Sequence, residues 1–254
     1  MSTWHYGLVA RWWAEFNHGG PEVEYFRPFV SAGQPALDAG CGAGRLLLPY
    51  FRDGLDVDGC DVSPDMLAEC RRLAAAEGLE PTLHAQALHE LELPRRYRTI
   101  VVCGAFGLGS TREQDAEALR RLHDHLEPGG LLALDAEAGW RFGDAEPGRA
   151  WPAEPPVERR RGADGAEYAL RSRLVGVDQA GLRTQLALRA WMWRDGELVA
   201  EEEHLLTEAF YERDELVALL GDAGFVDVEV RGGYHGGPPA PEDEMIVLLA
   251  RRAA

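Results

Sequence analysis

The sequence predicts an α/β fold with a seven-stranded, mostly parallel sheet, helices on both faces and an inserted antiparallel β lid. Three observations lead to this prediction. Short apolar runs alternate with helix-length amphipathic segments between residues 35 and 136, which is typical of parallel strands joined by crossover helices. Three longer strand-like runs follow one another between residues 168 and 206. A helix and two further strands then complete the sheet.

Two helices are expected before the first strand. Tyr6, Ala10, Trp13 and Phe16 fall at helical spacing on one face. Gly19-Gly20-Pro21 breaks this pattern, and a second short helix is predicted to reach about Phe29.

The core elements follow in order. The Ser63-Pro64-Asp65 segment opens a helix, because serine caps it, proline fits its first turn and aspartate meets the positive end of its dipole. Pro128-Gly129-Gly130 is expected to turn the chain into the fifth strand. The predicted strands are 35–39, 55–60, 82–85, 99–103 and 131–136, and the other predicted helices are 45–52 and 112–126.

The second half of the chain changes character. Residues 140–166 are rich in Pro, Gly, Arg and acids and are predicted to form a long mobile loop. Lid strands are expected at 168–177, 182–193 and 198–206, with Asp195-Gly196 as a hairpin turn. A helix at 212–223 and strands at 226–230 and 245–250 return to the core. We therefore divide one domain into 1–139 (helical cap and binding core), 140–206 (loop and lid) and 207–254 (last core elements).

Composition limits the function. The chain has 254 residues and carries 26 Lys and Arg against 43 Asp and Glu, a net charge of -17. Nucleic-acid and anionic-membrane partners are therefore disfavoured, and the one dense basic run, 159–161, is interpreted as a solvated loop. No apolar run is long enough to span a membrane, no secretory signal is recognisable, and a cytoplasmic location is expected. The four cysteines have no zinc spacing, so no metal site is expected.

The glycine-rich segment Leu37–Arg45 is the most informative motif. Gly40, Gly42 and Gly44 lie between a strand and a helix, where the backbone turns sharply and a ligand can approach it closely. A dinucleotide fingerprint starting at Gly40 would need glycine or alanine at Arg45, and the Gly-Lys-Ser/Thr of a phosphate-binding loop is absent. Asp38 is awkward beside a pyrophosphate and reasonable beside a cationic amino-acid moiety.

The segment resembles motif I of class I S-adenosylmethionine-dependent methyltransferases, whose pattern is D/E-x-G-x-G-x-G. The resemblance extends to Asp61–Leu67, which looks like the family's second motif, and to the Pro-Gly-Gly turn. It implies a Rossmann-like fold and S-adenosylmethionine as cofactor, with S-adenosylhomocysteine as product. The implied cofactor-binding residues are Asp38, Gly40, Cys41, Gly42, Gly44, Asp61 for the ribose, Val62 and Met66 for the adenine, and Cys103 through its backbone.

One departure from the family concerns the adenine. Many relatives carry an acid after the third strand, whereas Ala87 stands at that position here, between Gln86 and Leu88. We expect this segment to contact the adenine through the Gln86 side chain or through backbone atoms.

The residues on the acceptor side are predicted less directly. The segment around Tyr6 and Arg11 is similar to one that closes over the cofactor in small-molecule methyltransferases, and an amphipathic helix with a buried aromatic stripe is the alternative. His204, His235 and Tyr6 are candidate catalytic residues, and each histidine also fits an ordinary structural role. The predicted substrate contacts are Phe106, Trp191, Trp193 and Tyr234, although the tryptophans also fit packing within the lid.

The sequence therefore predicts a methyltransferase that acts on a small-molecule acceptor by N- or O-methylation, as a monomer or homodimer. A non-catalytic S-adenosylmethionine-binding protein and a protein methyltransferase remain as alternatives. A nicotinamide-dependent oxidoreductase is disfavoured by Arg45.

Overall fold

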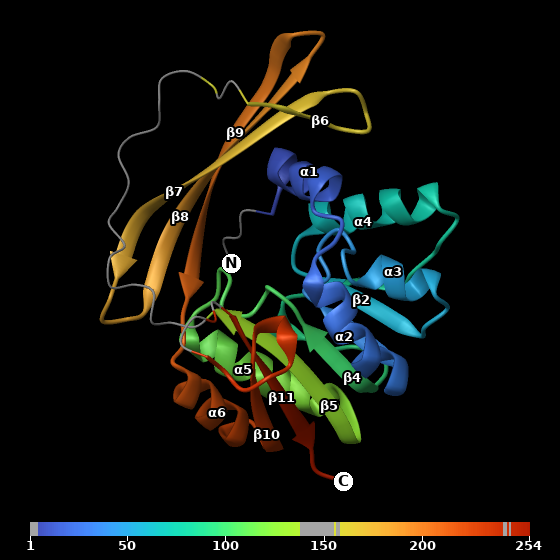
Figure 1. Ribbon diagram of the computed structural model, residues 1–254, viewed down its shortest axis with the longest axis vertical. Helices are drawn as coiled ribbons and strands as arrows, with labels where there is room; N and C mark the ends of the chain where they lie inside the picture. The colour runs from blue at the N-terminus through green and yellow to red at the C-terminus, as the bar shows by residue number, and fades with distance from the viewer. Residues whose placement is uncertain (1–4, 138–154, 156–157, 241–242, 244) are drawn as a thin grey trace.

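A twisted seven-stranded sheet lies at the centre of the computed structural model, which describes residues 5–137, 155, 158–240, 243 and 245–254 (Figure 1). The strand order is β10-β11-β5-β4-β1-β2-β3. Strands β1 to β5 are parallel to one another, and β11 runs antiparallel to both β5 and β10. The strands are β1 (Ala36–Ala39), β2 (Val57–Asp61), β3 (Leu83–Ala85), β4 (Tyr97–Val102), β5 (Leu126–Glu137), β10 (Phe225–Gly232) and β11 (Met245–Arg252).

Helices cover both faces of this sheet, as the alternating pattern predicts. The helices are α2 (Pro21–Ala32), α3 (Leu47–Arg52) and α4 (Pro64–Ala76) on one face and α5 (Arg112–His125) and α6 (Arg213–Asp222) on the other. Phe26 and Leu67 are fully buried on the first face, and Leu119 is fully buried on the second. Burying each such side chain contributes about 1.5–3 kcal/mol. The two layers of helices leave the carboxyl ends of β1, β2, β4 and β5 free to form a site.

Local signals place the helix that follows β2. The Ser63 hydroxyl accepts a hydrogen bond from the amide of Met66 at 3.2 Å, Pro64 takes the first helical position, and Asp65 lies in the first turn. Helix α5 begins with a full capping box between Thr111 and Gln114. The polar residues before each helix therefore fix where the chain leaves the carboxyl edge of the sheet.

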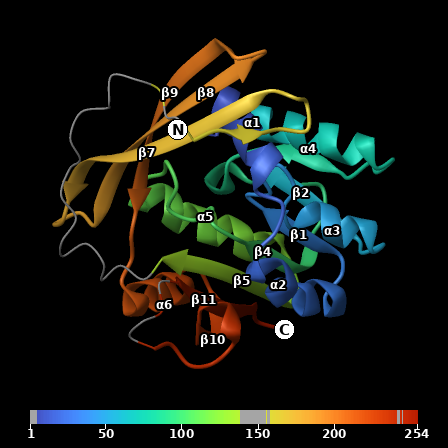
Figure 2. The ribbon, with the colours of Figure 1, turned by 45° about the horizontal axis from the view of Figure 1, so that its top comes forward.

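A second, antiparallel sheet stands over the carboxyl edge of the first. Its strands, in the order β6-β7-β8-β9, are β6 (Arg160–Arg161), β7 (Glu167–Asp178), β8 (Arg183–Arg194) and β9 (Glu197–Ala209). Asp195 and Gly196 have φ values of 53° and 83° and form the predicted hairpin turn. Helix α1 (Gly7–Phe16) lies between this sheet and α4 (Figures 1 and 2). Val9 of α1 is fully buried in the same cluster as Leu188 of β8.

Two carboxylates from distant parts of the chain cap the start of α1. The Gly7 amide donates to Asp65 Oδ2 on α4 at 2.8 Å, and the Leu8 amide donates to Glu202 Oε2 on β9 at 2.8 Å. Both negative charges lie at the positive end of the helix dipole, where they are favourable. Helix α1 is thus attached to the core and to the second sheet at the same point.

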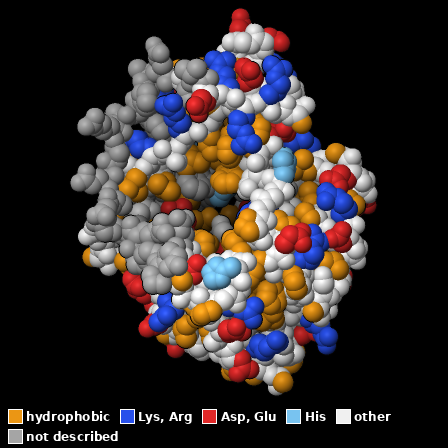
Figure 3. Space-filling view, viewed as in Figure 1, with side chains coloured by type: hydrophobic (Ala, Val, Ile, Leu, Met, Phe, Trp, Pro, Cys, Tyr) orange, Lys and Arg blue, Asp and Glu red, His pale blue; other side chains and the backbone are white. Residues whose placement is uncertain are grey.

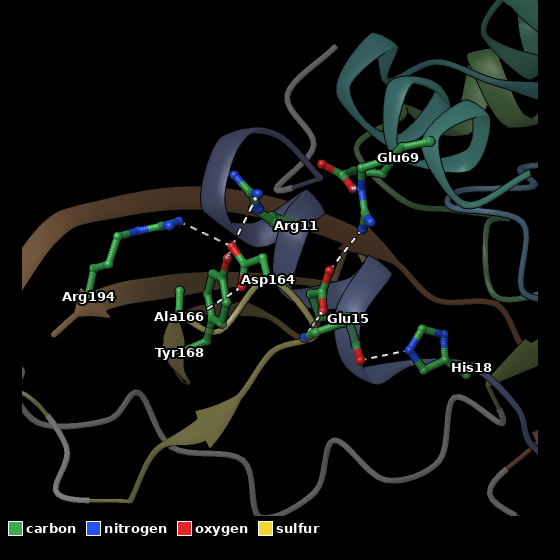
Figure 4. A network of polar contacts seen from close by, with 10 residues as sticks. Arg11, Glu15, His18, Glu69, Asp164, Ala166, Tyr168 and Arg194 are labelled. Carbon is green, nitrogen blue, oxygen red and sulfur yellow. Dashed lines mark hydrogen bonds and ion pairs between the residues drawn. The ribbon is translucent and has the colours of Figure 1, made fainter. Parts of the chain in front are cut away.

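A polar network makes the same connection at the other end of α1 (Figure 4). The buried Glu15 accepts from Arg72 of α4 at 2.9 Å and from the Ala163 amide of the β6–β7 turn at 2.7 Å. One turn earlier on α1, Arg11 pairs with Asp164 at 3.3 Å. Asp164 also accepts from Tyr168, which extends the network into β7. The network ties α1, α4 and the second sheet together through side chains that do not line the cavity.

Three local predictions differ from the structure. The helix predicted from Arg45 begins at Leu47, because the glycine turn continues as far as Leu46. Pro128-Gly129-Gly130 was predicted to be a turn that precedes the fifth strand, but these residues lie within β5. The pairing of β5 with β4 shifts in register here, between Tyr97 and Thr99 of β4. The basic run 159–161 is not simply a solvated loop. Arg160 and Arg161 form β6, and the Arg160 guanidinium lies 4.1 Å from the Phe16 ring centroid.

Most of the loop predicted over 140–166 lies outside the described residues. In the part of the chain that the structure describes, no helix has the length and apolar character that crossing a membrane requires.

Candidate functional site

The turn after β1 requires glycine at specific positions. Gly40 has φ 89° and Gly42 has φ 53°, both in the left-handed region that glycine adopts without strain. A Cβ at Gly40 would lie under 3.0 Å from the Cβ of Ala105, in the segment after β4. The amides of Gly40 and Cys41 both donate to the Cys60 carbonyl on β2, at 2.8 and 2.9 Å. The turn is therefore fixed against its two neighbouring strands, with its backbone open to the space beyond them.

That space is a cavity of about 770 Å³ at the carboxyl ends of β1, β2, β4 and β5. Figure 3 shows the molecule hollowed near its centre, with apolar side chains gathered on the walls. The glycine turn and Met66 form one part of the wall, and Leu186 of β8 and Glu208 of β9 belong to another. His5 and Trp13 bring the N-terminal segment into the wall as well. A cavity at this edge of an open parallel sheet is the usual ligand position for such folds.

Three carboxylates face the cavity: Asp38 on β1, Asp61 on β2 and Asp135 on β5. Asp61 ends β2, where its two oxygens accept from the amides of Gly42 and Ser63 at 2.9 and 2.8 Å. Asp135 on β5 accepts from the Gly104 amide and from the Tyr234 hydroxyl, each at 2.6 Å. Burial raises the pKa of both groups. These two carboxylates hold together the backbone around the cavity as well as lining it.

Asp38 differs from the other two because one of its oxygens has no partner. Its Oδ2 atom is buried and makes no hydrogen bond with the protein. Burial, and then the neighbouring Asp61, raise the pKa of Asp38 to about 7. A buried carboxylate oxygen that lacks a hydrogen-bond donor is unfavourable unless a ligand supplies the donor. Asp38 is therefore suited to a cationic donor such as an ammonium group.

These features match the groups that S-adenosylmethionine needs for binding. Asp38 would accept from its ammonium group, Asp61 has lone pairs left for ribose hydroxyls, and the glycine turn leaves room for close approach. A Cβ at Gly42 would lie 2.9 Å from the Met66 side chain, so glycine also keeps clear the wall that would face the adenine. Val62 and Met66 both line the cavity next to Asp61.

The cavity wall includes most of the predicted cofactor-binding residues. Those lining it are Asp38, Gly40, Cys41, Gly42, Asp61, Val62, Met66, Gln86, Ala87, Leu88 and Cys103, together with Phe106 from the predicted substrate set. The Gln86 oxygen already accepts from the Glu92 amide at 2.8 Å and its amide donates to the Glu92 carbonyl, so this side chain braces its own loop. Burial raises the pKa of the Cys103 thiol well above its ordinary value, which leaves it protonated.

Four other predicted residues lie just behind the wall or beside it. Gly44 packs α3 against α4, since a Cβ there would meet Leu48 and Cys70 under 3.0 Å. Tyr234 does not line the cavity but donates to Asp135, which does. Tyr6 lies close enough to Asp61 that its pKa is raised, chiefly by burial and then by this carboxylate. Arg11 does not line the cavity and pairs with Asp164 in the network of Figure 4.

The structure does not bring the two candidate histidines or the two tryptophans to the cavity. His204 lies 3.1 Å from Glu202, and His235 lies 3.0 Å from Asp243. Trp191 and Trp193 are buried together in the antiparallel sheet β6-β7-β8-β9, here also called the lid sheet. This is the packing role given above as their alternative. Their alternation along the strand correctly places them on one face, but that face is not the cavity.

Several wall residues were not singled out from the sequence. Ser110, Asp115 and Tyr211 line the cavity as a connected group, because both Ser110 and Tyr211 donate through their hydroxyls to Asp115, the latter at 2.6 Å. Asp135 was detectable as a lone acid within the apolar run of β5. Glu208 was not, because it stands in a strand with many acids.

Comparisons with known proteins agree with this geometry. Residues 36–130 match the family model described as a methyltransferase domain. The dTDP-3-amino-3,4,6-trideoxy-alpha-D-glucopyranose N,N-dimethyltransferase of Streptomyces venezuelae is 29% identical over 100 residues, covering 39% of this chain and only 40% of that protein.

Solved structures resemble the whole fold. The sugar N-methyltransferase KedS8 of Streptoalloteichus sp. superimposes with a TM-score of 0.69 at 19% identity, covering 92% of this chain and 88% of the other. The glycopeptide N-methyltransferase MtfA complexed with S-adenosylhomocysteine gives a TM-score of 0.55 at 20% identity, covering 91% and 89%. The seven-stranded sheet with its separate antiparallel sheet is thus a methyltransferase fold, and the predicted fold class is confirmed. Residues 36–130 therefore match a methyltransferase domain, and the chain as a whole has the fold of solved S-adenosylmethionine-dependent methyltransferases.

Proposed function

We propose that the protein transfers a methyl group from S-adenosylmethionine to a small-molecule acceptor, at a nitrogen or an oxygen atom. The observation that carries this proposal is the continuity of the cavity, which extends from the glycine turn to side chains of the antiparallel sheet. The first part suits the cofactor, and the second part supplies apolar and polar groups for another molecule. Two of the compared proteins are described as acting on sugars or as an N,N-dimethyltransferase of an amino sugar, which supports a small acceptor.

The chain's own residues have defined tasks in this proposal. The bound cofactor supplies a methyl group on a positively charged sulfur atom. Asp38 and Asp61 would hold its ammonium and ribose groups, while Phe106 and Leu186 give the acceptor side apolar walls. Holding donor and acceptor in line accounts for much of the acceleration expected for such a displacement. A base is needed only when the acceptor must lose a proton.

The test combines binding and turnover. Calorimetric titration should show binding of S-adenosylmethionine and S-adenosylhomocysteine, and a panel of small amines and phenols should contain an acceptor whose methylation releases S-adenosylhomocysteine. If the protein binds the cofactor and methylates a protein substrate but no compound of the panel, the small-molecule proposal is contradicted. Absence of binding to both compounds would overturn the cofactor assignment as well.

The raised pKa of Asp38 predicts how cofactor binding depends on pH. A cationic ammonium group favours the ionised carboxylate, which in the free protein forms as the pH rises through about 7. Affinity for S-adenosylhomocysteine should therefore increase between pH 6 and pH 8, while Asp38→Asn should bind more weakly and lose this pH dependence. Titrations of both proteins at pH 6, 7 and 8 measure the effect. Equal slopes in the two proteins would show that another group is responsible.

A further inference from the structure

The end of β9 is fixed beside the segment that follows β4. The Ala209 amide donates to the Gly107 carbonyl at 2.9 Å, and the Gly109 amide donates to the Thr207 carbonyl at 2.7 Å. Glu208 lies between these two hydrogen bonds and lines the cavity. A Cβ at Gly107 would lie 2.5 Å from the Ala209 carbonyl oxygen, so glycine is what permits this close approach. The position of Glu208 is thus set by the backbone on both sides.

The surroundings of Glu208 are apolar and acidic. Leu186, Phe210 and Met245 line the same cavity. Thr184 donates its hydroxyl hydrogen to Glu208 Oε2 at 3.2 Å, and the negative charge of Glu137, at the end of β5, also acts on Glu208. Among the described residues Glu208 forms no ion pair with a cation.

The wall as a whole is strongly negative. Among the described residues it contains six carboxylates, and Arg45 is its one arginine or lysine. Arg45 already pairs with the buried Glu22 and donates to the Cys103 sulfur. His89 in the wall is hydrogen-bonded to Gln114. A cavity with this balance favours cationic occupants over neutral or anionic ones.

We propose that Glu208 selects a protonated amine as the acceptor and removes a proton from it before methyl transfer. The inference rests on the proposed function and names the acceptor class of the same cavity. Glu208 attracts the ammonium group into the acidic cavity, where this partly buried carboxylate has no cationic partner among the described residues and a cation restores the balance of charge. Thr184 orients the carboxylate through its hydrogen bond, and the negative charge of Glu137 increases the affinity of the carboxylate for a proton.

The proposed step balances in atoms and charge. The ammonium gives one proton to the Glu208 carboxylate, which leaves a neutral amine with a free electron pair. That pair forms the new N–C bond as the S–C bond of the cofactor breaks, and the bonding electrons of the broken bond go to sulfur. The products are a methylated ammonium and neutral S-adenosylhomocysteine sulfur. The proton on Glu208 passes to water when the site opens.

The environment tunes Glu208 for this exchange. Burial, followed by the charge of Glu137, raises the pKa of Glu208 to about 7. The carboxylate is therefore a stronger base than an ordinary glutamate and comes closer to the pKa of an alkylammonium, which is about 10. Glu208 is protonated below pH 7 and charged above it, so amine binding should strengthen as the pH rises through this range.

The experiment compares a cation with a neutral molecule of the same shape. The complex with S-adenosylhomocysteine is titrated with benzylamine and with benzyl alcohol at pH 6 and pH 8. The wild type should bind benzylamine more tightly than benzyl alcohol at pH 8 and lose part of this preference at pH 6. Glu208→Gln should weaken benzylamine about tenfold at pH 8, leave benzyl alcohol unchanged and remove the pH dependence.

Control variants separate this effect from a general change in charge or fold. Glu203→Gln removes an exposed acid from the same strand, away from the cavity wall, and should bind both probes as the wild type does. Glu208→Asp keeps the charge and should retain part of the preference. An unchanged preference in Glu208→Gln, with S-adenosylhomocysteine still bound, would overturn the role of Glu208 alone. Loss of S-adenosylhomocysteine binding by the wild type would overturn the proposed function instead.

Discussion

Replacing Asp61 with alanine is expected to weaken the affinity for S-adenosylhomocysteine by at least tenfold, and by several hundredfold if both ribose hydroxyls bind to it. The carboxylate accepts from the amides of Gly42 and Ser63, so its removal also leaves the glycine turn less well held. Hydrogen bonds to a charged group contribute about 1.5–3 kcal/mol each, and 1.4 kcal/mol corresponds to a factor of ten. Calorimetric titration measures the change directly.

The matched control is Asp58→Ala on the same strand. Asp58 is a carboxylate on β2 like Asp61, but it binds the Tyr97 hydroxyl at 2.9 Å and Arg95 at 3.0 Å and does not line the cavity. This variant should lose stability and keep its affinity for S-adenosylhomocysteine within about threefold. Similar affinities in the two variants would show that Asp61 does not contact the ligand.

The variant Gly40→Ala should lose both stability and cofactor binding. The left-handed φ of 89° costs a residue with a Cβ about 1–2 kcal/mol, and the clash with Ala105 adds about 1–3 kcal/mol of overpacking. Relief of this clash moves either the glycine turn or the segment after β4, and both line the cavity. We expect the free energy of unfolding in urea to fall by about 2–5 kcal/mol.

Gly78→Ala separates backbone strain from the clash. Gly78 ends α4 with φ 70°, and a Cβ there would have no atom within 4 Å. This variant should lose only about 1–2 kcal/mol and bind S-adenosylhomocysteine normally. If the two alanine variants were equally stable, close packing against Ala105 would not be what demands glycine at position 40.

The sequence predicted the core well because local and long-range signals agree there. Ser63, Pro64 and Gly78 mark the two ends of α4, and the structure places both ends where these residues indicate. The strand run through Pro128-Gly129-Gly130 was missed because pairing between β4 and β5 overrides the usual turn preference of these residues. The helix after the glycine turn started late for a related reason, since Gly42 and Gly44 both adopt positive φ.

Prediction of the site divided along the same line. Residues within one sequence motif, such as Asp38 and Gly42, line the cavity together because the turn itself brings them there. Residues recruited from far along the chain were harder to predict. His204 and Glu208 lie four residues apart on β9, yet only Glu208 reaches the cavity, because the pairing of β9 with the segment after β4 decides which position faces it. No periodicity in the sequence contains that information.

The double capping of α1 has an energetic consequence. Ordering this helix costs conformational entropy, and the hydrogen bonds from its first amides to Asp65 and Glu202 offset that cost together. Trp13 of α1 and His5 just before it line the cavity, while Leu8 and Glu15 form hydrogen bonds with β9 and with the β6–β7 turn. Interactions that order α1 on the cavity side would therefore also favour its contacts with the antiparallel sheet, and the reverse effect has the same size. The contacts of α1 with the cavity and with the antiparallel sheet are therefore linked through one ordered helix.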